Sequence, residues 1–208
     1  MPVAERKRPW YLVLALLGAL ALGTTGACSG WTTVALYREP IDPSLASEGI
    51  PDEADRVAIV ARVQAYLQAL DAAKRRGWPI GVATMLLGGA VFVFAMRALG
   101  GHAGARTVLI QLVVAQAGIN AAQFWLMRDV FEADLHLFEA KQAAQIHERV
   151  PERTRADDMA RAASAMLRAA NPIVFALRSL TSALVVVALT RRRSREFFNG
   201  AGEAVEER

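Results

Sequence analysis

The sequence holds few of the residues that membrane-bound chemistry uses. Its 208 residues include one cysteine, Cys28, which excludes a disulfide framework and paired thiols for redox work. Its three histidines all lie outside the long apolar runs, which argues against haem held inside a membrane. Those runs also lack Asp and Glu, which argues against a proton-coupled exporter. With neither a Ser/His arrangement nor a phosphate-binding glycine loop, an enzyme is the minority interpretation, and no cofactor is expected.

What the sequence has in abundance is apolar length. It is 54% hydrophobic, and four stretches reach the roughly 20 apolar residues that cross about 30 Å of hydrocarbon. These spans cover residues 10–37, 78–99, 107–127 and 172–190. We therefore predict an all-α, polytopic membrane protein, in which a bundle of four transmembrane helices makes one membrane domain.

The positive charge gathers in three segments that four spans would place on one side of the membrane. They contain Arg6, Lys7 and Arg8; Arg97 and Arg106; and Arg191, Arg192, Arg193 and Arg195. The positive-inside rule then makes residues 1–9, 100–106 and 191–208 cytoplasmic, with both termini inside. The net charge of +4 is thus a topology signal, and no nucleic-acid partner is expected. Usage rich in Ala and Arg is typical of GC-rich bacteria, so we expect a bacterial inner membrane.

Residues 38–77 and 128–170 are then the two extracytoplasmic regions, each with helical character. In the first, prolines at 40, 43 and 51 interrupt the chain, and an amphipathic helix follows with Val60, Val63, Leu67 and Leu70 on one face. Asp52, Glu53 and Asp55 suit its start. Gly77 is predicted to end this helix, and Pro79 to open the second span.

The second region has no helix breaker between Met127 and Val150, which predicts that the third span continues straight out of the membrane. Pro151 should stop that helix. Thr154 and Asp157 resemble a capping box for a return helix that leads to Pro172 and the fourth span. The three outer helices have similar lengths, so we predict a small extracytoplasmic helical bundle above the membrane.

The first span allows a second interpretation. Basic residues, an apolar run and then Thr25-Gly26-Ala27-Cys28 resemble a bacterial lipoprotein signal with a lipid-accepting cysteine. Thr25 stands where that signal usually has Leu or a similar residue, and the apolar run continues to Tyr37, which is longer than the apolar region of a typical signal peptide. We therefore favour an uncleaved anchor.

Small residues recur along the first span and predict close helix packing. Ala15, Ala19, Gly23 and Ala27 repeat every four residues, and Gly26 with Gly30 makes a second small pair. Such rows let backbones approach where lipid offers no hydrophobic contrast. The neighbour is another helix of the bundle or, alternatively, an identical subunit or another membrane protein.

Arg178 is the one charged residue well inside a span, an expensive position. We predict a polar layer at its depth, formed by Arg178, Asn120, Gln116, Gln123, Thr24, Thr25 and Thr84. Arg178 then either bonds neighbouring helices or snorkels to headgroups, or it serves an anionic ligand, a conduction path or a partner's carboxylate.

A metal site is only weakly indicated, by Glu132, His136 and Glu139 on one helical face, where solvated i, i+4 pairs are the commoner outcome. The leading functional expectation is a non-catalytic membrane component, a scaffold or accessory subunit that contacts other membrane subunits or a second copy. A channel, transporter or lipid-binding protein that uses the layer around Arg178 is the alternative, with anionic lipid as a further candidate partner. A membrane sensor comes third.

Overall fold

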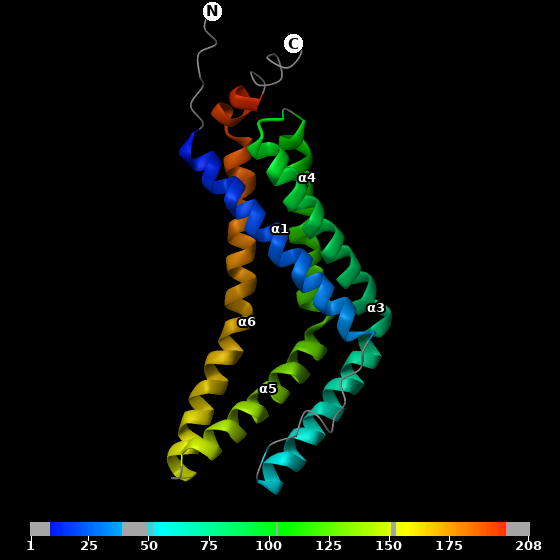
Figure 1. Cartoon of the computed structure of the whole chain (residues 1–208), viewed down its shortest axis with the longest axis vertical. Coiled ribbons are helices and arrows are strands. Elements are labelled where there is room, and N and C mark those ends of the chain that lie inside the picture. Colours follow the sequence, from blue (N-terminus) through cyan, green and yellow to red (C-terminus); the bar gives the residue numbers. More distant parts are fainter. Residues whose placement is uncertain (1–8, 39–49, 51, 103, 151–152, 199–208) are drawn as a thin grey trace, which may run out of the picture. The chain divides into compact units, whose positions relative to one another are not determined.

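The computed structural model describes residues 9–38, 50, 52–102, 104–150 and 153–198. These residues form α1 (Trp10–Leu36), α3 (Glu53–Leu99), α4 (Ala105–Leu126), α5 (Arg128–Arg149) and α6 (Arg153–Thr190), as Figure 1 shows. A short helical stretch at residues 192–198 follows, and none of the described residues forms a strand. The all-helical prediction is confirmed. The predicted breaks at Pro40, Pro43, Pro51 and Pro151 lie outside the described residues.

The helices α1, α3, α4 and α6 are each long and apolar enough to cross a membrane, which confirms the prediction of four helices of that length and composition. Two of them are much longer than a crossing requires. With 47 and 38 residues, α3 and α6 extend roughly 70 and 57 Å at 1.5 Å per residue. A crossing of about 30 Å of hydrocarbon would use less than half of α3 and about half of α6.

The start of α3 follows from its sequence. Asp52 Oδ1 accepts a hydrogen bond of 2.8 Å from the backbone N–H of Ala54, which satisfies a donor that the first turn leaves free. Glu53 and Asp55 add negative charge to the same turn, where it complements the helix dipole. The predicted acidic start of this helix is therefore confirmed.

The predicted helix end at Gly77 is wrong, because α3 continues to Leu99 with Pro79 inside it. Pro79 has no amide hydrogen, so the helix forgoes one backbone hydrogen bond there. Gly77 serves packing instead: a methyl group added to it would lie 2.0 Å from Tyr37 Oη and 2.9 Å from Met127 Cε. A glycine that makes room for a side chain looks the same in sequence as one that ends a helix.

The other two predicted junctions also differ. Met127, with φ −108° and ψ 17°, separates α4 from α5, although the backbone bonds Met127 N–H to Gln123 O and Phe131 N–H to Met127 O both persist at 3.0 Å. One residue thus interrupts the helix that was expected to be continuous. Pro172, expected at the start of the fourth span, lies inside α6.

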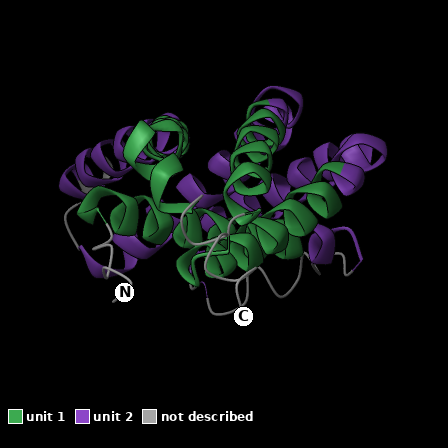
Figure 2. Ribbon diagram, turned by 90° about the horizontal axis from the view of Figure 1, so that it is seen from above, with its two compact units in different colours: residues 1–32, 80–121, 176–208 green, residues 33–79, 122–175 purple. Residues whose placement is uncertain are grey.

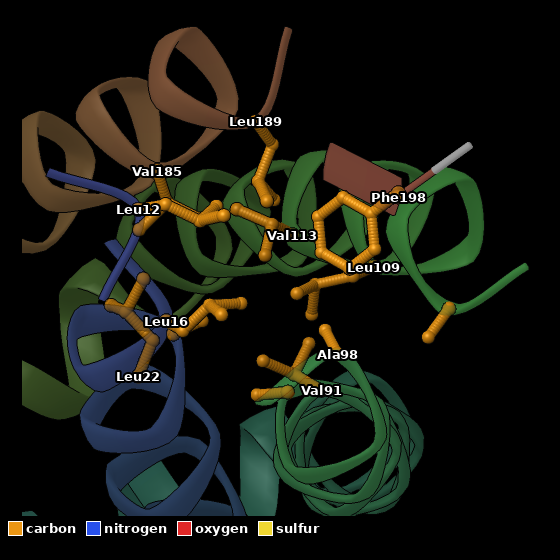
Figure 3. Close-up of a cluster of buried hydrophobic side chains, with 13 residues drawn as sticks. Leu12, Leu16, Leu22, Val91, Ala98, Leu109, Val113, Val185, Leu189 and Phe198 are labelled. Carbon is orange, nitrogen blue, oxygen red and sulfur yellow. The ribbon is translucent and has the colours of Figure 1, made fainter. Parts of the chain in front are cut away.

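The chain divides into two compact units, coloured separately in Figure 2. Unit 1 comprises residues 1–32, 80–121 and 176–208, and unit 2 comprises residues 33–79 and 122–175. In unit 1, a buried apolar cluster draws side chains from α1, α3, α4 and α6 and from the C-terminal helical stretch (Figure 3). Its larger members are Leu12, Leu16, Leu22, Val91, Leu109, Val113, Val185, Leu189 and Phe198.

Unit 2 has a buried cluster of its own, built between α3 and α5. Its members are Ile59, Val63, Tyr66, Leu70, Ala73, Met127, Val130, Leu137 and Ala144. The predicted amphipathic face of residues 60–70 therefore supplies part of this core. None of the cluster's members comes from α6.

Candidate functional site

The small residues of α1 pack against helices of the same unit. A methyl group added at Gly23 would lie 2.6 Å from the backbone nitrogen of Phe92, and one at Gly30 would lie 2.3 Å from that of Met85. Both contacts are with the backbone of α3, which no side-chain rotation can relieve. Ala15 and Ala19 are buried and Ala27 is half-buried in the same unit. Within the described structure, the glycines of α1 thus form an intramolecular packing face.

Gln116 makes the clearest polar contact between two apolar helices. Its Nε2 donates a 3.0 Å hydrogen bond from α4 to the Leu22 carbonyl of α1, and the side chain is buried. Gly26 makes the contact possible, since a methyl group there would lie 2.1 Å from this Nε2. The Gln116 Oε1 is buried and accepts no hydrogen bond from the described residues. A buried acceptor without a partner costs free energy. The stabilising contribution of this amide is therefore the hydrogen bond that its nitrogen donates.

The threonines expected in the polar layer are bonded within their own helices. Thr84 is buried, and its hydroxyl donates to Ile80 O at 2.8 Å. Thr24 and Thr25 are exposed, and their hydroxyls donate to Leu20 O and Ala21 O at 2.9 and 2.8 Å. Each hydroxyl thus meets its hydrogen-bonding need locally, as threonines in helices commonly do.

Arg178 and the other two amides stand apart from these contacts. Arg178 is half-buried, and its guanidinium has neither hydrogen bond nor ion pair to any described residue. The nearby Ser182 hydroxyl donates to the Arg178 carbonyl at 2.9 Å. Asn120 and Gln123 are also half-buried, without a hydrogen bond from either amide within the described parts of the chain. A role for Arg178 with these amides stays a prediction.

The arginine-rich end of unit 1 contains contacts that sequence reasoning missed. Arg106 Nε, at the start of α4, donates a 2.7 Å hydrogen bond to the Leu189 carbonyl at the end of α6. Ser194 is fully buried and donates to Ala188 O at 2.7 Å, and Phe198 is buried in the core of unit 1. The signal was present: two phenylalanines one turn beyond a run of arginines are typical of a short amphipathic helix.

Glu132, His136 and Glu139, the weakly indicated metal site, take part in ion pairs on the surface of unit 2. Arg168 of α6 binds both carboxylate oxygens of Glu139, at 2.8 and 3.2 Å, and His136 lies 3.4 Å away. Glu132 pairs instead with Arg128. The hydrogen bond from Arg168 lowers the Glu139 pKa below its usual value. Among the described residues, no three His, Cys, Asp or Glu side chains are placed to share a metal ion.

Two tyrosines line the core of unit 2. Burial, more than its neighbour Asp134, raises the pKa of Tyr66 to about 12. The Tyr37 hydroxyl lies against Gly77 and has no hydrogen-bond partner in the described structure. The raised pKa keeps the Tyr66 phenol neutral at physiological pH, and both side chains contribute packing to this core.

No family model matches this chain, and neither the comparison with curated proteins nor that with solved structures gave a match.

Proposed function

We propose that the chain is a non-catalytic integral membrane component that assembles with a second copy of itself through one exposed face of α6. The observation that carries the proposal is the poor burial of this helix in unit 2. Among the described side chains of residues 154–175, only Ala156 is buried. Helices in proteins owe most of their stability to a packed apolar face, so this section of α6 is incompletely packed.

The apolar residues of α6 in unit 2 follow a heptad pattern. Met159, Ala163, Met166, Ala170 and Ile173 are spaced alternately by four and three residues. We call these five residues the α6 seam. Its three larger side chains are between 47 and 78% exposed. Alternating spacings of three and four define the contact line of a coiled coil.

Lipid can cover only part of this seam. Residues 154–170 include Arg155, Asp158, Arg161 and Arg168, which would be costly to place in hydrocarbon. The seam residues Met159 and Met166, which lie in this charged section, therefore face water unless a protein covers them. Exposed methionines next to alanines suit a closely approaching helix, because alanine keeps the two backbones near each other.

The residues flanking the seam favour a second copy over a different chain. On one flank both positions are alanine, at residues 162 and 169, and on the other the chain has Ala160, Leu167 and Val174. The charges that usually set partner choice in coiled coils are missing from these flanks. Two copies inserted in one membrane have parallel α6 helices, so identical seam residues can meet across a two-fold axis.

Disulfide cross-linking in membranes tests this contact. Cys28 is the only cysteine and is exposed, so Cys28→Ser provides a thiol-free background. In that background Met166→Cys places a thiol on the seam, and Ala165→Cys places an equally accessible one on the next residue, off the seam. We expect mild oxidation to link most of the Met166→Cys chains into dimers, because seam residues meet within disulfide range. Ala165→Cys should give little dimer.

Equal yields at 165 and 166, or no dimer at 166, would overturn pairing through the seam. The mass of the natural protein purified in gentle detergent distinguishes a dimer of this chain from a complex with a different chain and from a monomer. A stoichiometric complex with a different chain would keep the accessory role and reject the second copy. A lone monomer would reject the assembly function as well.

We further propose that the arginine-rich segments at 1–9, 100–106 and 191–208 face the cytoplasm, with residues 38–77 and 128–170 on the outer side. The support is the distribution of arginines, which the positive-inside rule associates with the cytoplasm. Reporter fusions at residues 45, 102 and 205 should give an outer signal only at 45. An outer signal at 102 or 205 would reverse the assignment.

A channel or transporter built on the polar layer has weaker support. The three threonine hydroxyls are satisfied inside their own helices, and the Gln116 amide nitrogen is occupied by a backbone carbonyl. Unused hydrogen-bonding groups remain on Arg178, Asn120, Gln123 and the Gln116 Oε1, but no hydrogen bond among the described residues joins them into a path.

A further inference from the structure

The described residues of unit 1 are almost without negative charge. They include seven arginines but a single carboxylate, that of Glu196. Six of the arginines lie at the ends of the apolar helices or in the stretch that follows α6: Arg97, Arg106, Arg191, Arg192, Arg193 and Arg195. Glu196 is engaged by Arg192 at 2.8 Å. The remaining five lack a carboxylate partner among the described residues.

These arginines are carried on a fixed surface rather than on a free tail. Phe198 is 1% exposed within the apolar core of unit 1, where Figure 3 shows its ring beside Leu109. The buried Ser194 ties the same stretch to the end of α6 through Ala188 O. Arg195, the one arginine between these two anchor points, therefore keeps a defined position relative to α4 and α6.

Arg106 and Arg195 come together at the end of α6. Arg106 Nε donates to Leu189 O, and Ser194, the residue before Arg195, donates to the neighbouring carbonyl of Ala188. Only the Nε of Arg106 donates to Leu189 O, so its two terminal nitrogens remain free to donate. No carboxylate among the described residues pairs with either arginine, so an anion would relieve their repulsion, and guanidinium forks match the oxygens of a phosphate.

The surroundings identify the source of that phosphate. Arg191 lies over the ring of Tyr11 at 5.3 Å, so the start of α1 belongs to the same end of unit 1. Trp10 beside it is exposed, as are Leu14 and Leu17 further along α1. An exposed indole and arginines at the end of apolar helices mark the level of lipid headgroups. The exposed leucines offer a path for acyl chains.

We propose that Arg106 and Arg195 bind the phosphate of an anionic phospholipid, with Arg191 and Tyr11 beside its headgroup and the acyl chains along α1. The site is independent of the α6 seam, because it uses neither a seam residue nor a second copy. It is a specific lipid site in which the docking of Phe198 sets the distance between two cationic groups.

The experiment compares two variants with the same change of net charge. Arg195→Gln removes a member of the site, whereas Arg192→Gln removes a neighbour whose charge Glu196 already balances. Each protein is placed in nanodiscs with phosphatidylglycerol and phosphatidylcholine, released into detergent, and weighed by native mass spectrometry. The natural chain should retain phosphatidylglycerol in preference to phosphatidylcholine. Arg195→Gln should lower that retention about fivefold, and Arg192→Gln less than about twofold.

Equal losses in both variants would show diffuse surface attraction and overturn the site, as would the absence of any preference for phosphatidylglycerol. Displacement of the lipid by millimolar inorganic phosphate would replace the lipid source with a free anion. Arg195→Lys guards against misfolding: it keeps the charge but loses the fork, so intermediate retention supports the proposal. Full retention by Arg195→Lys together with Arg195→Gln would reject it.

Discussion

Replacing Gly88 by alanine should destabilise unit 1 by about 3 kcal/mol or more, because the added methyl group has no space to enter. It would lie 2.3 Å from the backbone nitrogen of Ala27, 2.7 Å from Gly26 C and 2.8 Å from Gly23 O. All three atoms belong to the backbone of α1. The two helices must therefore separate, and the contacts of Gly23 and Gly30 with α3 would be lost together with this one.

The neighbouring glycine supplies the control for this prediction. A methyl group at Gly89 meets nothing within 4 Å. Gly89→Ala should therefore be neutral or stabilising by up to about 1 kcal/mol, since alanine favours the helix. Unfolding of both variants in detergent, followed by circular dichroism against added denaturant, measures the difference. Similar stabilities for Gly88→Ala and Gly89→Ala would contradict backbone contact between α1 and α3.

The contact between α1 and α3 shows how much of the helix packing the sequence alone predicts. The four-residue spacing of Gly23 and Ala27 predicts a face for close packing, because spacing depends only on helical geometry. It cannot say which helix meets that face. The partner is fixed by contacts distant in sequence, such as Gly88 with Ala27. The helix end predicted from Gly77 and Pro79 is wrong for a related reason. Local propensity favours a helix end there, but in the structure Gly77 packs against Tyr37 and α3 continues to Leu99.

The polar residues show the same limit. Composition singles out Gln116 and Arg178, because polar groups are rare in apolar spans. Their partners depend on the direction of each side chain and on the gap that faces it. Gln116 finds the Leu22 carbonyl only because Gly26 leaves room. The threonine hydroxyls donate to carbonyls one turn earlier in the same helix, and contacts of this kind can be predicted from helical spacing alone.

Replacing Phe198 by alanine should release residues 191–198 from unit 1. The ring is 1% exposed, and emptying its place in the core removes about 3–5 kcal/mol of packing. A stretch of this length is held mainly by that ring and by the buried Ser194. The amides of Ser194 and Arg195, which donate to Arg191 O at 3.0 and 3.2 Å, should then exchange with deuterium roughly a hundredfold faster or more.

Phe197 provides the comparison, because it is half-buried at the edge of the same cluster. Phe197→Ala should accelerate exchange at these two amides far less. Equal acceleration in both variants would mean that the stretch is held by general apolar contact rather than by the Phe198 ring. Unchanged exchange in Phe198→Ala would contradict the docking altogether. Release would also leave Arg195 free to move away from Arg106, so the preference for phosphatidylglycerol should weaken in Phe198→Ala although every arginine remains. Position, and not charge alone, then determines lipid binding at this end of the protein.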